Sequence, residues 1–226
     1  MKHVLAGILS IGFLFNICFA AEKLELKGQK ESYSLGYQFG QGAKNQGIDI
    51  NLEVYTSGIR DALSGSPPQL SLEEMRQIVS ELQKRIVAAR EKELKEMSVK
   101  NLATGKVFME ENKKKEGVKT LPSGLQYKVL AEGSGKTPKA ADNVTVNYKG
   151  TFINGAEFDS SYKRGKPTTF QVDKVIKGWT EALQLMKEGS KWQLFIPPEL
   201  GYGDRGGGPV PPNSTLIFEV ELISVK

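Results

Sequence analysis

The chain has 226 residues, of which 39% are hydrophobic, 25% are charged and 8% are aromatic, and its net charge is +5. These fractions are ordinary for a globular protein of one or two domains, and they exclude wholesale disorder. The chain has one cysteine, Cys18, and one histidine, His3, and both lie within the first twenty residues.

The first predicted element is an export signal at residues 1–20. The basic residue Lys2 precedes a short apolar run that ends at Ala20, and polar sequence follows from Glu22. This order is typical of a secretory signal peptide. A retained membrane anchor is the alternative, but the run is shorter than the roughly 20 apolar residues that a transmembrane helix needs. We therefore expect cleavage after Ala20 or Ala21 and an exported protein.

Cleavage would remove both Cys18 and His3 from the mature chain. A chain without them has no disulfide, thiol nucleophile, imidazole base or Cys/His metal site. The sequence therefore excludes Cys–His and Ser–His hydrolases and zinc enzymes, and we expect no metal and no cofactor.

Two short helices are predicted next, at about residues 30–45 and 51–64. They are too short to bury their own apolar faces, and small residues recur every four positions in the first helix. Small residues on one face let two helices approach closely, so we expect residues 21–70 to associate two copies of the chain. Packing against the next helix of the same chain is the alternative. The expected interface residues are Ser32, Leu35, Gly36, Phe39 and Gly40.

A third helix is predicted over residues 71–116, where the chain lacks proline. Ser71 and Glu74 have the spacing of a capping box at its start. Apolar residues then recur at alternating steps of three and four up to Ala89, and the rest of the helix is polar. We expect the polar half to be solvated and the helix to connect two bodies. Gly105 would be its weak point, at a cost of about 1 kcal/mol.

Residues 117–226 change to a period of two, which is typical of β-strands. Apolar and polar residues alternate in short stretches that glycine and proline separate. One short helix is predicted among them, from Gly178 to Lys187, with Trp179 on its apolar face. The fold class is therefore α+β, with a helical N-terminal half followed by a strand-rich domain of about 110 residues.

Two motifs in this domain are weak signals. Gly201–Gly206 matches the dinucleotide-binding fingerprint, but the glycines and prolines of residues 207–212 cannot form the helix that the fingerprint requires. Asn143 and Asn213 lie in glycosylation sequons, although ordinary strand-edge asparagines are the simpler interpretation.

The basic excess is not concentrated in one patch, so we expect no nucleic-acid binding.

A family resemblance rests on five sequence blocks, at residues 146–150, 155–161, 175–179, 200–203 and 211–222. In this order and at these spacings they resemble the FKBP-type peptidyl-prolyl cis-trans isomerases over residues 118–226. The whole layout resembles the macrophage infectivity potentiator (Mip) group of that family. The resemblance implies a helical dimerisation segment, a long connecting helix and a C-terminal antiparallel sheet wrapped around a short helix.

By matching position, the resemblance implies a pocket for the substrate proline with Trp179 as its floor. It also implies that the hydroxyl of Tyr202 and the backbone N–H of Ile176 hold substrate carbonyls. The implied catalytic residues are Tyr148, Asp159, Trp179, Tyr202 and Phe218, and the implied substrate-binding residues are Phe158, Phe170, Val175, Ile176 and Val210.

Two departures from the family pattern leave the substrate preference open. Thr168 stands where many members have an aromatic residue, and Pro209-Val210 replaces two bulky aliphatic residues. Without the resemblance, the residues also allow simpler interpretations, in which Trp179 is only a core residue and Asp159 only starts a turn.

The function that the resemblance implies is a peptidyl-prolyl isomerase for proline-containing segments of exported proteins, with chaperone activity as a homodimer. It also implies binding of macrolides such as rapamycin, and a place in the periplasm or at the outer membrane of a Gram-negative bacterium. The sequence does not indicate membrane association and leaves it open. The alternative is a holdase or surface-interaction module whose domain binds peptides but catalyses weakly.

Overall fold

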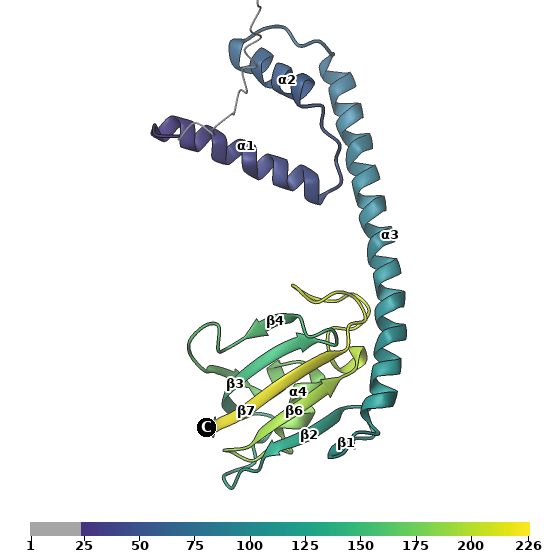
Figure 1. Cartoon of the computed structure of the whole chain (residues 1–226), viewed down its shortest axis with the longest axis vertical. Coiled ribbons are helices and arrows are strands. Elements are labelled where there is room, and N and C mark those ends of the chain that lie inside the picture. Colours follow the sequence, from purple (N-terminus) through teal and green to yellow (C-terminus); the bar gives the residue numbers. More distant parts are fainter. Residues whose placement is uncertain (1–23) are drawn as a thin grey trace, which may run out of the picture. The chain divides into compact units, whose positions relative to one another are not determined.

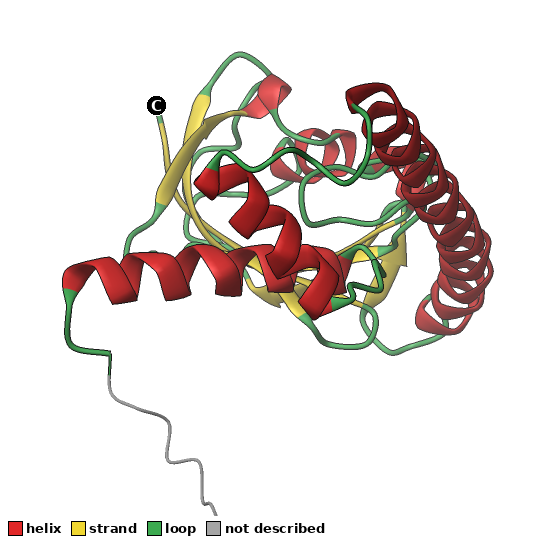
Figure 2. Ribbon diagram, turned by 90° about the horizontal axis from the view of Figure 1, so that it is seen from above, coloured by secondary structure: helices red, strands yellow, loops and turns green. Residues whose placement is uncertain are grey.

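The structure is a computed structural model that describes residues 24–226. The predicted signal peptide, its cleavage point, Cys18 and His3 lie outside the described residues. The chain divides into two compact units at residues 79 and 80. The first unit is helical and the second is rich in strands (Figure 1, Figure 2). No helix in the described part of the chain is long and apolar enough to cross a membrane.

The first unit contains α1 (Lys27–Asn45), α2 (Leu52–Ser64) and the beginning of α3 (Leu72–Asn112). These bounds confirm the two short helices that the sequence predicts. Asn51 caps α2 by accepting a hydrogen bond from the backbone N–H of Val54, and Gly65 ends the helix in a left-handed conformation. Most large apolar side chains of α1 and α2 are exposed. This unit therefore has little core of its own within one chain.

Helix α3 starts with the predicted capping box. The backbone N–H of Ser71 donates to the Glu74 carboxylate at 2.9 Å, and that of Glu74 donates to Ser71 Oγ at 3.2 Å. The helix is unbroken for 41 residues and ends at Asn112, four residues before the predicted end. Both the helix and its start are confirmed, and only the C-terminal bound is shorter.

The second unit is built on one antiparallel sheet of seven strands, in the order β1-β2-β6-β7-β3-β4 with β5 paired to β3 (Figure 1). Helix α4 (Lys177–Leu183) lies against the inner face of this sheet and ends four residues before the predicted Lys187. The strands are β1 (Val118–Thr120), β2 (Gln126–Ala131), β3 (Asn143–Phe152), β4 (Glu157–Ser160), β5 (Thr168–Gln171), β6 (Lys191–Ile196) and β7 (Leu216–Val225).

The core of this unit lies between the inner face of the sheet and α4. Side chains in β3 and β7 alternate between buried and more exposed positions, as the period of two predicts, and those of β6 do so except at Phe195, which is buried as well. Gly178 lets α4 approach β6, because a Cβ at this position would lie 2.8 Å from the Ile196 side chain. The inward-facing residues include Val144, Val146, Leu194, Ile196, Leu216, Val220 and Leu222, together with Ala182 and Leu183 of α4.

The polar second half of α3 is not solvated on all sides, which corrects the expectation from the sequence. The Phe108 ring lies 6.0 Å from the Phe195 ring, centroid to centroid, and Phe195 is only 5% exposed although it points away from the inner core. Asn112 is buried and donates to the Gln126 side chain at 2.9 Å. Gly105 is buried as well, and a Cβ there would collide with the Thr215 side chain. The absence of a side chain at Gly105 thus lets α3 pack closely against the strand-rich domain.

Candidate active site

A cavity of about 390 Å³ opens between the inner face of the sheet and the start of α4. Its lining comes from β3, β4, β5, β7, α4 and the connections before α4 and after β6. The lining residues are Tyr148, Phe158, Asp159, Phe170, Lys174, Val175, Ile176, Trp179, Tyr202 and Phe218.

Trp179 forms the floor of this cavity and is only 4% exposed. Its ring makes edge-to-face contacts with three aromatic neighbours: Tyr148 at 5.2 Å, Phe218 at 5.2 Å and Phe170 at 5.8 Å between centroids. Phe158 stands edge-on to Phe218 at 5.4 Å. Edge-to-face packing is a favourable geometry for aromatic rings, so these residues form a rigid apolar surface.

Gly150 in β3 explains how two of these rings reach the cavity. A Cβ at this position would lie 2.7 Å from the Phe158 ring and 2.7 Å from the Phe218 ring. Because glycine has no Cβ, both rings can pack directly over the β3 backbone. The block at residues 146–150 therefore shapes the cavity through a missing side chain as well as through Tyr148.

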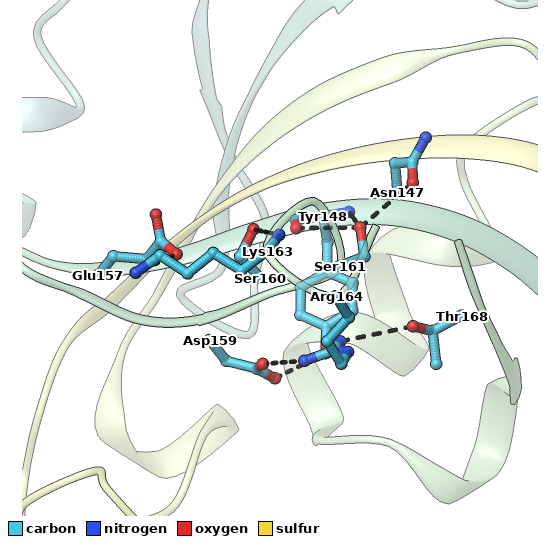
Figure 3. Close-up of polar contacts among 9 residues, drawn as sticks. All are labelled: Asn147, Tyr148, Glu157, Asp159, Ser160, Ser161, Lys163, Arg164 and Thr168. Carbon is cyan, nitrogen blue, oxygen red and sulfur yellow. Dashed lines mark hydrogen bonds and ion pairs between the residues drawn. The ribbon is translucent and has the colours of Figure 1, made fainter. Parts of the chain in front are cut away.

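A polar network closes the rim beside Tyr148 (Figure 3). The Tyr148 hydroxyl donates to Asp159 Oδ2 at 2.6 Å, and Arg164 donates to Asp159 Oδ1 at 2.5 Å and to the Tyr148 hydroxyl oxygen at 2.5 Å. Thr168 also accepts a long hydrogen bond from Arg164, at 3.4 Å. The proton of the Tyr148 hydroxyl is thus directed at Asp159 and not into the cavity.

The turn that carries Arg164 is anchored on β3. The buried Ser161 hydroxyl donates to the Asn147 side chain at 3.2 Å and accepts the backbone N–H of Tyr148 at 2.9 Å (Figure 3). This anchor fixes the backbone between Asp159 and Arg164, so the two charged side chains are preorganised to form their ion pair.

The pKa values of Asp159 and Tyr148 are shifted in opposite directions. Burial raises the pKa of the Asp159 carboxyl, but hydrogen bonds from Tyr148 and Arg164 and the guanidinium charge outweigh burial, so this pKa lies below its usual value. Burial, followed by the hydrogen bond to Asp159, raises the pKa of Tyr148. Asp159 is therefore ionised and Tyr148 is neutral at neutral pH.

Tyr202 also lines the cavity and is 41% exposed. Burial and then the negative charge of Asp159 raise its pKa, so its hydroxyl is neutral. Gly207 lies against this ring, since a Cβ there would be 2.8 Å from Tyr202 Cδ1. The backbone N–H of Ile176 has no acceptor among residues 24–226, which leaves a donor for a ligand at the cavity.

The structure brings nine of the ten predicted pocket residues together around one cavity. Val210 lies elsewhere: it is 4% exposed, packs in the core cluster and pairs through its backbone with Gly207. The prediction that Val210 lines the pocket is corrected, because the loop turns its side chain into the core. Asp159 lies within β4 and bonds to Tyr148, so it does more than start a turn.

Sequence reasoning missed Lys174, which lines the cavity, and Arg164, which holds Asp159. Arg164 stands five positions after its partner in an irregular turn, where no periodic pattern points to an ion pair. The predicted interface residues Ser32, Leu35, Gly36, Phe39 and Gly40 are all exposed on α1, where the structure describes them.

No group of this network changes its charge near neutral pH, which gives a testable pH profile. We expect kcat/KM for a peptide substrate to stay flat from about pH 5 to about pH 9, because the pKa of Asp159 is lowered and those of Tyr148 and Tyr202 are raised. Ionised Asp159 also contributes to the free energy of unfolding. This contribution is present above the pKa that Asp159 has in the unfolded chain, and it is lost as the pH falls through the lower pKa of the folded protein. A bell-shaped profile with a pKa near neutrality would contradict this site.

Comparison with known proteins gives consistent matches. Residues 134–223 match the family described as FKBP-type peptidyl-prolyl cis-trans isomerase, and residues 28–129 match the domain amino terminal to FKBP-type peptidyl-prolyl isomerase. The chain is 47% identical to the outer membrane protein MIP of Legionella longbeachae, over 100% of this chain and 98% of that protein. It is 43% identical to the peptidyl-prolyl cis-trans isomerase Mip of Coxiella burnetii, over 100% of this chain and 99% of that protein.

A solved structure agrees with these matches. The crystal structure of FkpA from Escherichia coli aligns with a TM-score of 0.67 at 41% identity, and the alignment covers 90% of this chain and 99% of that chain. The likeness therefore includes the helical segment and the long helix as well as the strand-rich domain.

Proposed function

Because the chain belongs to the FKBP-type peptidyl-prolyl cis-trans isomerases and accelerates rotation of Xaa–Pro bonds in protein folding, we propose that it does so in the aromatic cavity above Trp179. The observation that carries this proposal is the arrangement of Tyr148, Phe170 and Phe218 edge-on around the Trp179 ring. This surface is apolar, preformed and open to a ligand.

The physical chemistry of the reaction suits such a surface. Amide resonance sets a rotation barrier of roughly 18–20 kcal/mol, and no bond breaks during rotation. Resonance separates charge in the planar imide, and water stabilises that planar form. An apolar cavity removes this stabilisation, whereas the twisted transition state has less charge separation and loses less. Binding the twisted form more tightly than the planar form lowers the barrier, and each reduction of about 1.36 kcal/mol increases the rate tenfold.

The polar residues around the cavity have separate roles in this proposal. The Tyr202 hydroxyl and the Ile176 N–H are donors for substrate carbonyls on either side of the proline. Tyr148 contributes its ring as a wall, since its proton is directed at Asp159. The Arg164 guanidinium forms an ion pair with the ionised Asp159 carboxylate and also donates to the Tyr148 hydroxyl, so it holds the two side chains together. These groups orient the peptide, while the aromatic rings remove water from it.

The assignment can be tested in the refolding of a protein whose slow phase is limited by prolyl isomerisation. We expect the full chain to accelerate that phase and rapamycin to abolish the acceleration, because the macrolide would occupy the same cavity. Acceleration that persists at saturating rapamycin would mean that catalysis takes place elsewhere.

We further propose that the helical unit forms a homodimer and supports chaperone activity. Leu35 is 70% exposed on α1, and Gly36 and Gly40 have nothing within 4 Å of where a Cβ would lie. Phe39 stacks on Tyr55 of α2 at 4.4 Å between centroids and still remains partly exposed. A single chain leaves these apolar groups in water, so a second copy would bury them.

The dimer proposal predicts the result of one charge introduced into α1. Leu35→Glu should shift the mass measured by light scattering from dimer towards monomer, since the new carboxylate would be buried without a partner. Ser34→Glu is the matched control, because in the part of the chain that the structure describes the Ser34 hydroxyl bonds only to the carbonyl of Lys30 in its own helix. If both variants have the wild-type mass at every concentration, the interface does not include Leu35.

The place of action is part of the proposal as well. We propose export to the periplasm or the outer membrane of a Gram-negative bacterium, with proline-containing exported proteins as substrates. The basic-then-apolar start of the chain supports export, and the relative from Legionella longbeachae is named an outer membrane protein.

A further inference from the structure

Residues 212–214 are held to α3 by side-chain hydrogen bonds. Asn101 donates to the backbone carbonyl of Pro212 at 2.8 Å and, at 3.5 Å, to the Ser214 hydroxyl. The Asn213 side chain donates to the Ser98 hydroxyl at 2.8 Å. Two side chains of one helix thus hold three consecutive residues of a loop that is distant in the sequence.

Asn213 connects this contact to the cavity. It is the only non-glycine residue with a positive φ, 53°, in the described part of the chain, a conformation that asparagine tolerates better than most residues. In this conformation its backbone N–H donates to the carbonyl of Gly203 at 2.9 Å. Gly203 directly follows Tyr202, the proposed donor to the substrate.

Other contacts of the loop restrain Tyr202, so a displacement of Asn213 would also displace Tyr202. The N–H of Gly203 donates to the Pro198 carbonyl at 2.9 Å, and the Tyr202 ring lies against Gly207. Gly207 in turn exchanges backbone hydrogen bonds with Val210, whose side chain is fixed in the core. The position of Tyr202 therefore depends on the loop as a unit, and α3 holds one end of it.

The contacts of α3 follow one helix face. Ser98, Asn101, Gly105, Phe108 and Asn112 are spaced by alternating steps of three and four, which places them on the same side of the helix. Each of them contacts the strand-rich domain. Because Gly105 has no side chain, α3 comes close enough for the short side chains of Ser98 and Asn101 to reach the loop.

We propose that Ser98 and Asn101 are positioning residues for the isomerase reaction, which fix Tyr202 at the cavity through Asn213 and thereby help to set which peptides are accepted. This inference rests on the proposed assignment of the cavity. It makes α3 a part of the substrate-binding apparatus of this chain, in addition to its place between the two units in the sequence.

The test uses the full chain with the double substitution Ser98→Ala/Asn101→Ala and a panel of peptides that differ in the residue before proline. We expect KM to rise by about threefold or more while kcat stays within about twofold, and the preference among the peptides to flatten. Thr104→Ala is the control, because within residues 24–226 the Thr104 hydroxyl bonds only to carbonyls of its own helix, and the KM of this variant should match wild type. An unchanged KM and preference in the double variant would overturn the proposal.

Asn213→Gly separates the side-chain contact from backbone strain, because glycine keeps the positive φ and loses only the bond to Ser98. We expect it to raise KM in the same direction as the double variant. Circular dichroism should show all variants folded at the assay temperature.

A double-mutant cycle with Tyr202→Phe shows whether the effect passes through Tyr202. In the Tyr202→Phe background, the substitutions at Ser98 and Asn101 should change KM by less than about 1.5-fold, since the hydroxyl that they position is absent. Full additivity would overturn the proposal and leave a merely structural role for the α3 contacts. Failure of the cavity assignment has a different signature, namely full activity in a Trp179 variant.

Discussion

Trp179→Leu is expected to lower kcat/KM for an Xaa–Pro peptide at least about tenfold, which corresponds to about 1.4 kcal/mol of lost transition-state stabilisation. The substitution removes the floor of the cavity and the edge-to-face contacts with Tyr148, Phe170 and Phe218. A smaller aliphatic side chain leaves room for water beside the imide, and water stabilises the planar ground state. The loss should therefore appear in the catalysed rate and not only in binding.

The second tryptophan provides the control for this experiment. Trp192 is 6% exposed, belongs to the same core cluster and stacks on Tyr127 at 4.4 Å between centroids, but it does not line the cavity. Both leucine variants should lower the free energy of unfolding by about 2–4 kcal/mol, because each loses buried ring contacts. Only Trp179→Leu should lose activity among the molecules that remain folded. Equal loss of activity in both variants would mean that general destabilisation explains the effect.

A chain that starts at residue 117 is expected to be less stable than one that starts at residue 80, by about 2–5 kcal/mol in the free energy of unfolding. The shorter chain lacks the end of α3. Phe195 would become exposed without Phe108, and Gln126 would lose hydrogen bonds to Asn112 and to the Met109 carbonyl. The boundary at Gly117 suggested by the sequence would thus cut through one folded unit.

Urea unfolding of both truncated chains measures this difference. Phe108→Ala in the chain from residue 80 is the matched variant, and it should account for part of the difference without any change in chain length. If the two truncated chains unfold at the same urea concentration, the end of α3 contributes nothing to the stability of the strand-rich domain.

Much of the fold could be predicted because its signals are periodic or local. The capping box of Ser71 and Glu74 marks the start of α3, and the alternation in β3, β6 and β7 follows the buried face of the sheet. Eight of the ten residues that line the cavity could be predicted because the sequence blocks that carry them resemble a family with a known pocket.

Three features could not be predicted: the contacts of α3 with the domain, the partner of Asp159 and the direction of the Val210 side chain. The residues that form them show no periodic hydrophobic pattern. The face of α3 that contacts the domain has one large apolar residue, Phe108, among serine, asparagine and glycine, so it has the appearance of a solvated helix surface. Arg164 reaches Asp159 from an irregular turn, and Val210 points into the core because of the local path of its loop. Such contacts depend on tertiary structure, which a single sequence does not display.

The central claim is that the substrate proline lies on Trp179, and nuclear Overhauser effects between a bound Xaa–Pro peptide and the two indole rings test it most directly. Exchange between the cis and trans forms of the peptide shows in the same sample that catalysis takes place. We predict cross-peaks from the proline ring protons to the Trp179 indole and none to the Trp192 indole, and rapamycin should remove them together with the exchange. Catalysed exchange with no cross-peak to Trp179 would contradict the account.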